Sequence, residues 1–497
     1  MAKTLMVQGT GSGVGKSVLV AALCRILWKD GRRVAPFKSQ NMALNSFVTA
    51  EGLEMGRAQV MQAEACGLAP TVKMNPVLLK PSGDTRSQVV VMGRPVGERE
   101  AGKYYADRPE LFRQMSEAFR ALASEYEIIV LEGAGSPAEI NLRHADMVNM
   151  AMAREARAPV LIVGDIDRGG VFAWMKGTYD LLDPEERRHV KGFLINKFRG
   201  DLSLLESGVR MFEEMVGLPV LGVIPFFRDI HLDEEDAVPV ETLRPPCPEG
   251  GIDIAVIYFP HISNFTDFLA LAREPDVSVR YVRSADRLGR PDLIVLPGTK
   301  NTIEDLLRIR SVGLEDAVLR RVQSGTPVAG ICGGFQMLGR VIEDPERVES
   351  REGRVRGMDL VPMRTVMTSE KQTIQVSLST APNAFTPGGI TVCGYEIHMG
   401  RTIVESELSP LFEPGAARSA SVVAGDRILG TYVHGLFDSD AFRLHFLNGL
   451  RSRKGLEARP FSFDYRAFKQ EQLDRLEAVV RGHLDMEAVL RILERGL

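Results

Sequence analysis

Two glycine-rich segments of this 497-residue chain combine a reactive side chain with a sharp turn. The first, GTGSGVGKS at residues 9–17, lies between an apolar run and a helical pattern. The second, GICGG at residues 330–334, places a cysteine between glycines, again with an apolar run before it and a helical pattern after it. The first segment has residue types that bind phosphate, and the second has those of an exposed nucleophile.

The first segment predicts a phosphate-binding loop. Its glycines let backbone N–H groups converge on phosphate oxygens at a helix N-terminus, while Lys16 reaches the β- and γ-phosphates and Ser17 offers its hydroxyl to Mg²⁺. The spacing departs from the usual GxxxxGKS because position 10 is threonine, and a glycine loop without nucleotide is the alternative. The residues that we expect to bind the nucleotide here are Gly11, Ser12, Gly13, Val14, Gly15, Lys16 and Ser17.

Polar residues after other apolar runs predict the rest of this site. Glu132 ends the run IIVLE, where it would meet the metal or its water; a strand-end charge without a ligand role is the alternative. Lys38 follows the run RVAPF and would face the same rim. Asn196 is placed either to bind the adenine edge or merely to cap a turn. Asp146 either faces the same cleft or is an ordinary solvated carboxylate.

The second segment matches the nucleophile elbow G-x-S-x-G, with sulfur in place of oxygen. Small residues at 330, 333 and 334 suit this turn because neighbouring backbones approach closely. The elbow would expose Cys332 at the carboxyl edge of a sheet, where the N-terminus of the next helix favours the thiolate. We expect the N–H groups of Gly333 and Gly298 to hold an oxyanion there. A buried, inert thiol is the alternative.

A thiolate that attacks an amide needs an acid–base partner. Among the eight histidines, His434 in GTYVHGLF is the best placed because it ends an apolar run late in the chain. His398 in GYEIHMGRT is the second candidate. Cys332 and His434 together predict a site for thiolate acyl transfer.

The bulk composition is that of a globular protein from a reducing compartment. The net charge of −4 argues against a nucleic-acid partner. The five cysteines are scattered without a CxxC pair, which excludes a disulfide framework by spacing. No apolar run approaches the ~20 residues that span a bilayer, and the N-terminus does not resemble a signal peptide. We therefore expect a cytoplasmic protein with no membrane partner and leave a homo-oligomer open.

Apolar runs alternate with helical patterns along the chain, which predicts an α/β fold of two domains, each a mainly parallel sheet flanked by helices. Prolines and glycines in ETLRPPCPEGG predict a linker between them, and the charged stretch 343–357 predicts a surface loop. The runs expected as strands are 4–8, 33–37, 127–133, 159–167, 191–196 and 220–225, then 252–260, 277–282, 292–299 and 327–332. The expected organisation is a phosphate-loop domain over 1–243, a linker over 244–251, a second domain over 252–445 and a helical tail over 446–497.

The motifs resemble those of glutamine-dependent amidoligases. GTGSGVGKS, VLEGAGS and NKFRG resemble the dethiobiotin synthetase branch of P-loop NTPases. LPGTKNT, GICGGFQMLG and YVHG resemble class I glutamine amidotransferases, whose fold is flavodoxin-like. Over essentially the whole chain, PFKSQNMALNSFVT, EGAGSPAEINL, GDIDRGGVFA, INKFRGD and GYEIHMGRT resemble the cobyric acid synthase family.

The resemblance implies ATP- and glutamine-dependent amidation of adenosylcobyrinic acid a,c-diamide at its b, d, e and g carboxylates, which gives adenosylcobyric acid in cobalamin biosynthesis. It implies that Cys332 forms a glutamyl thioester and that His434 is its general base and acid. The residues that it assigns to ATP are 12–17, Lys38 and Asn196, with Ser17 and Glu132 near Mg²⁺.

One departure from the amidotransferase pattern concerns the histidine. Most class I members carry His-Pro-Glu, in which the glutamate orients the imidazole, but here Gly435 and Leu436 follow His434. Asp438 or a backbone carbonyl is then left to orient the ring. A weakly oriented base predicts slow glutamine hydrolysis until the synthetase site is occupied.

Four alternatives remain open at this point. Cobyrinic acid a,c-diamide synthase and CTP synthase join similar halves; SQNMALNS argues against the first, and the missing His-Pro-Glu argues against the second. A partition-type ATPase would carry a second lysine where this chain has Gly11, and it would lack the cysteine elbow. An acyl hydrolase with a degenerate nucleotide domain is the fourth alternative.

Overall fold

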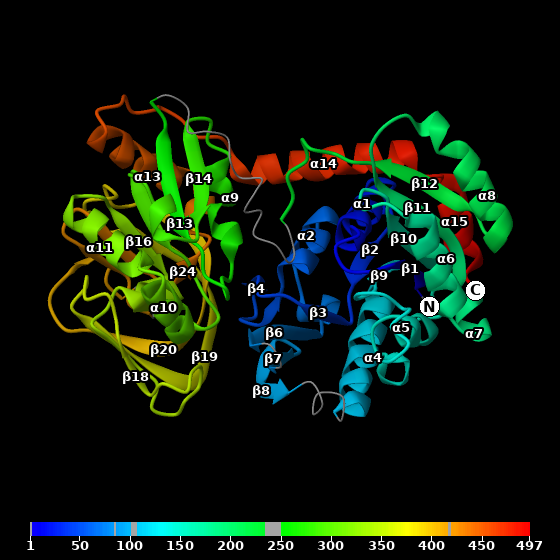
Figure 1. The fold of residues 1–497 in the computed structure, drawn as a ribbon, viewed down its shortest axis with the longest axis horizontal. Helices are drawn as coiled ribbons and strands as arrows, with labels where there is room; N and C mark the ends of the chain where they lie inside the picture. Colours follow the sequence, from blue (N-terminus) through cyan, green and yellow to red (C-terminus); the bar gives the residue numbers. More distant parts are fainter. Residues whose placement is uncertain (1, 84–85, 101–106, 234–249, 416–418) are drawn as a thin grey trace.

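The computed structural model describes residues 2–83, 86–100, 107–233, 250–415 and 419–497. Within these ranges the chain forms two α/β halves that lie side by side along the long axis (Figure 1). Both chain ends lie in the first half. The predicted linker over 244–251 falls outside the described residues, apart from its last two glycines.

The first half is built on a six-stranded sheet in which every neighbouring pair of strands is parallel. The strand order is β12-β11-β10-β1-β9-β2. All six apolar runs that were predicted as strands in this half are confirmed. The strands are β1 (Lys3–Gly9), β2 (Val34–Phe37), β9 (Ile128–Glu132), β10 (Val160–Asp165), β11 (Val190–Phe198) and β12 (Val220–Pro225).

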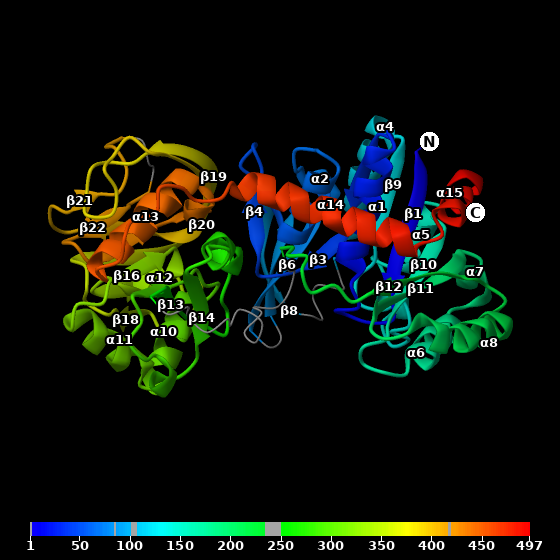
Figure 2. The ribbon, with the colours of Figure 1, turned by 90° about the horizontal axis from the view of Figure 1, so that it is seen from above.

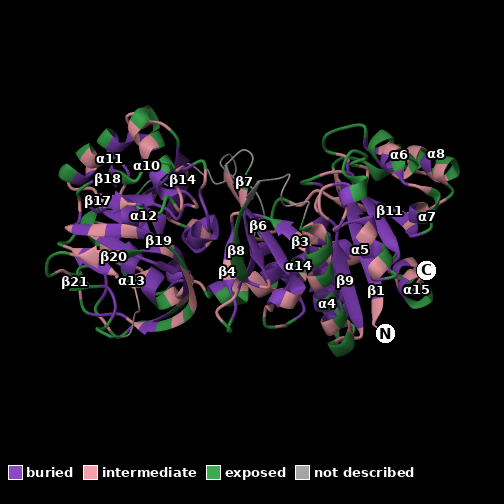
Figure 3. Cartoon of the chain, turned by 90° about the horizontal axis from the view of Figure 1, so that it is seen from below, coloured by how far each residue is buried: buried purple, intermediate pink, exposed green. Residues whose placement is uncertain are grey.

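Helices cover both faces of this sheet because its strands are apolar on both sides. Leu5 and Val7 of β1 share a core with α1, α14 and α15, whereas Met6 between them shares one with α4, α5, α6 and α8. Both cores are buried, as the purple strands in Figure 3 show. The helices of this half include α1 (Lys16–Lys29), α2 (Arg57–Ala65), α4 (Arg108–Glu125), α5 (Met150–Glu155), α6 (Val171–Leu181), α7 (Pro184–Arg187) and α8 (Glu206–Val216), with short turns η1 (Val72–Met74), η2 (Arg143–Ala145) and η3 (Leu202–Leu204).

An insertion between β2 and α4 lies between the two large sheets (Figure 1). It forms a four-stranded sheet of order β3-β6-β7-β8 and a separate β4-β5 pair. The strands are β3 (Gln40–Met42), β4 (Ser46–Val48), β5 (Glu54–Gly56), β6 (Val77–Gly83), β7 (Arg86–Val91) and β8 (Arg94–Glu100).

The second half contains a seven-stranded sheet of order β14-β13-β15-β16-β23-β22-β21. Its first five strands are parallel, as predicted, and β22 and β21 continue the sheet antiparallel. The elements are β13 (Ile252–Ile257), β14 (Val277–Val282), β15 (Leu293–Leu296), β16 (Val328–Ile331), β21 (Ser409–Pro410), β22 (Val422–Ala424), β23 (Ile428–Thr431), α9 (Leu269–Ala272), α10 (Thr302–Ser311), α11 (Leu314–Gln323), α12 (Gly333–Met337) and α13 (Asp440–Arg453), with turns η4 (Phe265–Phe268), η5 (Ala285–Arg287) and η6 (Leu436–Asp438).

A second, largely antiparallel sheet in this half was not predicted. Its order is β18-β17-β19-β20-β24, and β19 and β20 form a long hairpin. The predicted surface loop over 343–357 lies partly in this sheet, and Asp344 is fully buried there because its carboxylate accepts backbone N–H groups from Val348 to Ser350. The strands are β17 (Val341–Glu343), β18 (Arg354–Arg356), β19 (Met363–Ser379), β20 (Thr391–Val404) and β24 (Val433–His434).

The C-terminal helices return to the first half. Helix α14 (Tyr465–His483) runs from the boundary between the halves along the first half to α15 (Met486–Arg495) (Figure 2). Arg25 of α1 binds Asp474 of α14 at 2.8 Å, and Leu476 and Val480 complete the core on this face of the first sheet. The predicted helical tail is thus helical, although α13 crosses its expected start at 446 and belongs to the core of the second half.

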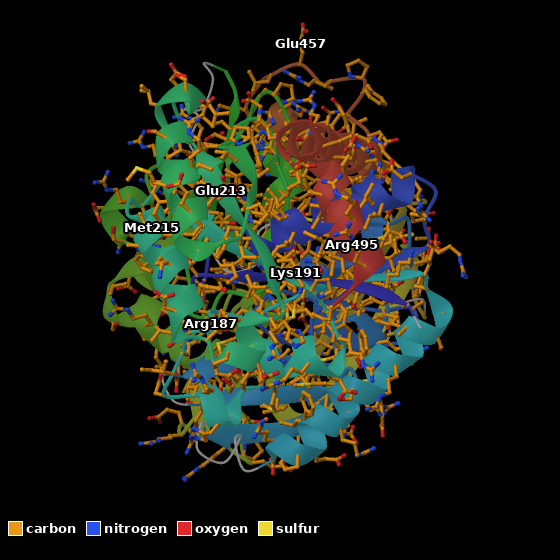
Figure 4. All side chains as sticks on the ribbon, turned by 90° about the vertical axis from the view of Figure 1, so that its right-hand side faces the viewer. Arg187, Lys191, Glu213, Met215, Glu457 and Arg495 are labelled. Carbon is orange, nitrogen blue, oxygen red and sulfur yellow. The ribbon has the colours of Figure 1, made fainter. Side chains whose placement is uncertain are left out.

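Figure 4 shows the outer end of the first half end-on, where charged side chains lie beside exposed apolar ones such as Trp174, Leu204 and Met211. Arg187, Lys191 and Arg495 are among the side chains labelled there, beside the exposed Met215 of α8. Within the described ranges, no helix combines the length and the apolarity that crossing a bilayer requires.

Candidate active site

The predicted phosphate loop connects β1 to α1 at the carboxyl edge of the first sheet. Gly13 and Gly15 have φ values of 71° and 99°, which glycine adopts without strain and which turn successive N–H groups inward. The Lys16 ammonium lies across the loop, 2.7 Å from the Gly11 carbonyl and 3.1 Å from that of Gly135. The loop therefore has the form that cradles phosphates.

Glu132, at the end of β9, is the centre of the predicted metal site. Its Oε1 accepts the Ser17 hydroxyl at 2.7 Å and lies 2.9 Å from the Lys38 ammonium. Its Oε2 accepts from Gln62 of α2 at 2.6 Å, a residue that sequence reasoning missed because no local motif marks it. Gln62 Oε1 is buried and, among the described residues, has no hydrogen-bond partner. The hydroxyl, carboxylate and amide oxygens together suit a hard cation such as Mg²⁺.

Residues at the end of β11 donate hydrogen bonds to carbonyl groups of the phosphate loop. Asn196 Nδ2 donates to the Val14 carbonyl at 2.9 Å, and the Lys197 ammonium binds the Gly13 carbonyl at 2.7 Å and Asp165 at 2.8 Å. The amide donor of Asn196 thus supports the loop, and its contact with adenine stays a prediction. An open cavity of about 810 Å³ begins directly after this strand end, lined in part by Phe198, Arg199, Phe226 and Phe227.

A large cavity of about 620 Å³ adjoins the phosphate loop at Ser12. Asp146 lines it, but its carboxylate accepts the backbone N–H groups of Val148, Asn149 and Ala151 at 2.7 to 2.9 Å and so shapes the wall. Other lining residues are Gln40, Met42, Leu79, Pro81, Arg86, Ser87, Val89, Gly135, Pro137, Leu142, Arg143 and Met147. The lining combines apolar side chains with two arginines and, besides Asp146, the carboxylates of Glu139 and Glu186.

Cys332 occupies a sharp turn between β16 and α12, as predicted for a nucleophile elbow. Its φ of 52° and ψ of −110° are strained for a residue with a side chain. A Cβ at Gly334 would come 1.9 Å from the Leu296 carbonyl oxygen, and one at Gly330 would come 2.7 Å from Leu338. The close approach of neighbouring backbones therefore explains the glycines on both sides of the cysteine.

A histidine and a carboxylate lie next to this cysteine, in the arrangement of a Cys-His-Asp triad. His434 Nδ1 lies 2.7 Å from Oδ2 of Asp267, and the imidazole is close enough to Cys332 for the thiol to affect its pKa. The Cys332 thiol itself donates to the Ile397 carbonyl at 3.5 Å. The second oxygen of Asp267 accepts the Gly435 N–H at 2.9 Å, which fixes the carboxylate. Burial by itself lowers the pKa of His434, but the charge and hydrogen bond of Asp267, together with Cys332, raise it to about 10.

Asp267 corrects the expectation that Asp438 or a backbone carbonyl orients the imidazole. Asp438 is half-buried nearby, where its partly desolvated setting raises its pKa to about 7, but the hydrogen bond to His434 comes from Asp267. Asp267 lies shortly after β13, in the turn η4, and the sequence signal that could have found it is this position after a parallel strand. The second candidate base, His398, binds Ser419 and the Gly400 carbonyl instead.

The predicted oxyanion residues lie beside the thiol. Gly333 supplies the first N–H of α12, which has no partner within the helix. A Cβ on Gly333 would touch Thr299, and one on Gly298 would lie 3.0 Å from the His434 ring. The structure thus brings Gly298, Gly333, Cys332 and His434 to one place, and the oxyanion role of the glycines stays a prediction.

Cys332 opens into a small cavity of about 40 Å³ to which both halves contribute. Lys80 and Gln88 come from the insertion of the first half, and Lys371 comes from β19. The buried carboxylate of Glu54 joins Lys80 at 2.8 Å to Lys371 at 2.5 Å. Burial favours the neutral acid, yet the two ammonium groups hold the pKa of Glu54 well below its usual value, so the cluster stays ionic.

One antiparallel hairpin, β6–β7, separates the large cavity from the small one. Successive side chains on a strand point to opposite faces, and here the two faces line different cavities. The residues on the large-cavity side are Leu79, Pro81, Ser87 and Val89, and those on the Cys332 side are the cross-strand pair Lys80 and Gln88. The large cavity, which the phosphate loop reaches at Ser12, and the thiol site are therefore neighbours across a single layer of backbone.

Two family models match the chain, one in each half. The description "CobQ/CobB/MinD/ParA nucleotide binding domain" matches residues 5–240. The description "CobB/CobQ-like glutamine amidotransferase domain" matches residues 253–442. A solved structure described as "Crystal structure of glutamine amidotransferase" is 16% identical, with a TM-score of 0.31, and the match covers 40% of this chain and 98% of that one.

Curated relatives match the chain from end to end. The cobyric acid synthase of Citrobacter koseri is 50% identical over 508 residues, which covers 100% of this chain and 99% of the relative. The cobyric acid synthase of Thermoanaerobacter sp. is 47% identical over 506 residues with the same coverage. Because similarity at this level covers 100% of this chain and 99% of each relative, the chain belongs to the cobyric acid synthase family.

Proposed function

We propose that the chain uses ATP and glutamine to amidate the b, d, e and g carboxylates of adenosylcobyrinic acid a,c-diamide, which gives adenosylcobyric acid. The observation that carries this proposal is the β6–β7 hairpin, which has a cavity beside the phosphate loop on one face and the Cys332 cavity on the other. Ammonia loses its nucleophilicity when water protonates it, so adjacent buried sites suit its transfer. Full-length similarity to cobyric acid synthases favours this reaction over that of CTP synthase.

In the second half, the thiolate of Cys332 attacks the side-chain amide carbon of glutamine. The N–H groups of Gly333 and Gly298 hold the oxygen that becomes negative. The His434 imidazolium donates its proton to the departing nitrogen, and ammonia leaves a glutamyl thioester behind. Water that loses a proton to the same imidazole then hydrolyses the thioester and releases glutamate.

In the first half, a carboxylate oxygen of the corrinoid attacks the γ-phosphorus of ATP, and ADP leaves. Lys16 and the loop N–H groups offset the charge that develops on the phosphates. A Mg²⁺ ion held by Ser17 and Glu132 would neutralise further phosphate charge. Ammonia then attacks the carbon of the acyl phosphate, and inorganic phosphate leaves the new amide. Lys38 lies beside Glu132, and Asn196 secures the loop.

The large cavity is the proposed acceptor site. Its volume of about 620 Å³ is in the range of sites for sizeable ligands, and it begins at Ser12 of the phosphate loop. Its apolar lining suits the macrocycle, and Arg86 and Arg143 suit carboxylate side arms. Asp146 contributes by fixing the wall at 146–151.

Incubation with adenosylcobyrinic acid a,c-diamide, ATP, Mg²⁺ and glutamine tests the reaction. Mass spectrometry should show four successive products, each with one carboxyl OH replaced by NH₂, together with ADP, phosphate and glutamate in equal amounts. Cobyrinic acid without the a and c amides is the matched control acceptor. Amidation of the a and c positions of that control, with no change of the a,c-diamide, would contradict the proposal.

Glutamine hydrolysis is expected to persist into alkaline pH and to fall as the pH rises through about 10. The reason is the raised pKa of His434: the imidazolium that protonates the departing amide nitrogen exists below that pKa and is lost above it. The measurement is a pH profile of kcat/KM for glutamine, with circular dichroism at each pH to confirm that the protein stays folded. A fall centred near pH 6.5, the ordinary histidine pKa, would contradict the assignment.

A further inference from the structure

Two hydrogen bonds, here called the clasp, join the insertion of the first half to the turn that carries Asp267. Asn45 Oδ1 accepts the Phe265 N–H at 3.2 Å, and Asn264 Oδ1 accepts the Ser46 N–H at 3.1 Å. Across the boundary between the halves, each asparagine side chain thus accepts the backbone N–H of the residue that follows the other asparagine. Asn45, Ser46 and Asn264 are each no more than 2% exposed, so water does not compete for these bonds.

This clasp bears directly on the triad. Asn264 has a left-handed φ of 53°, and its carbonyl accepts the Asp267 N–H at 3.1 Å, so Asn264 starts the turn that presents Asp267 to His434. The Tyr395 hydroxyl donates to the Ser46 carbonyl at 3.1 Å, while its ring stacks on the His434 imidazole at 5.4 Å. The first half therefore binds the turn that carries the carboxylate. Through the Ser46 carbonyl it also binds Tyr395, whose ring covers one face of the imidazole.

The other end of the same segment lies in the large cavity. Gln40 and Met42 of β3 line it, and Met42 is 52% exposed. The Ala43 N–H then donates to the Leu79 carbonyl at 3.0 Å, which ties the segment to the hairpin wall. Residues 40–46 therefore connect the acceptor cavity to the triad by continuous, hydrogen-bonded backbone.

We propose that Asn45 and Asn264 are positioning residues for the Cys332–His434–Asp267 triad, and that residues 40–46 make glutamine cleavage respond to occupancy of the large cavity. The inference rests on the proposed function for the identity of the occupant. A ligand against Gln40 and Met42 shifts the segment, and the clasp transmits that shift to the turn of Asp267. The coupling of glutamine cleavage to occupancy of the large cavity thus has a structural basis that is independent of the missing glutamate after His434.

Asn45→Ala tests the clasp by removing the oxygen that binds the Phe265 N–H. We expect kcat for glutamine hydrolysis to fall about tenfold with KM unchanged, as for the loss of one buried hydrogen bond that acts on orientation. Stimulation of hydrolysis by ATP with the a,c-diamide should disappear, and amidation driven by free ammonia should be unchanged. Asn264→Gly removes the clasp from the other side and tolerates the left-handed φ, so it keeps the test valid if Asn45→Ala folds poorly.

Thr373→Val is the matched control. It removes another hydrogen bond between the halves, from Thr373 to the Gly52 carbonyl at 2.7 Å, without touching the turn of Asp267. Its glutamine kcat and stimulation should match the wild type. The proposal is overturned if Asn45→Ala and Asn264→Gly retain wild-type hydrolysis and stimulation, or if ammonia-driven amidation falls with them. If the wild-type protein fails to amidate with ammonia, the proposed function is contradicted instead. The values of kcat for glutamine hydrolysis in the two variants then still test the role of the clasp.

Discussion

Cys332→Ala is expected to lower glutamine-driven amidation by about 10⁴-fold or more while amidation driven by free ammonia continues. The alanine side chain cannot form the thioester, so no ammonia is released in the second half. The phosphate loop is expected to stay unchanged because the Cys332 thiol donates to the Ile397 carbonyl and lines the small cavity, in which no residue of that loop takes part. The measurement is the rate of amide formation with glutamine and, separately, with an ammonium salt at alkaline pH.

Cys393→Ala is the control for cysteine replacement in general. Cys393 lies on β20 in the same half, is exposed, and its thiol points to the Ser377 hydroxyl, so both rates should match the wild type. Loss of the ammonia-driven rate in Cys332→Ala would show that residue 332 serves the synthetase reaction as well. An acyl hydrolase would show neither rate in any variant.

Asp267→Asn is expected to lower kcat for glutamine hydrolysis by about 10²- to 10⁴-fold. An amide in place of the carboxylate no longer stabilises the imidazolium and favours the wrong tautomer of His434. Because the Asp267 carboxylate raises the pKa of His434, the alkaline fall of the pH profile should also move to lower pH in this variant. The measurements are kcat for glutamine and its pH profile, and ammonia-driven amidation should be unaffected.

Asp438→Asn separates the two candidate carboxylates. Burial raises the pKa of Asp438 to about 7, and no hydrogen bond joins it to His434 among the described residues. The glutamine rate of this variant should therefore stay near that of the wild type. If Asp438→Asn lost more activity than Asp267→Asn, the orientation of the imidazole would have to be reassigned.

The sequence predicted the parallel strands well, for a physical reason. Strands buried on both faces are continuous apolar runs, and all ten such runs are strands in the structure. The long hairpin β19–β20 escaped this reasoning because it alternates exposed and buried residues and is rich in charged and polar side chains. Half-buried antiparallel strands carry a weaker signal than fully buried parallel ones.

Local motifs likewise identified the reactive groups but not all of their partners. A phosphate loop and a nucleophile elbow are short, because the turn that exposes Lys16 or Cys332 is built from adjacent residues. Asp267 is 167 residues before His434 along the chain, and apart from its position after a parallel strand no motif marks it as the partner. Gln62 was missed for the same reason, since it reaches Glu132 from an inserted helix.

By itself, the sequence determined the two α/β halves, the phosphate loop with Ser17 and Glu132, and the pairing of Cys332 with His434, because each depends on residues close in the chain or on strand ends. Only the tertiary structure decided which carboxylate completes the triad, that α14 and α15 return to cover the first sheet, and that one hairpin separates the two cavities. These features depend on packing between segments hundreds of residues apart, and no local pattern of residue types encodes such contacts.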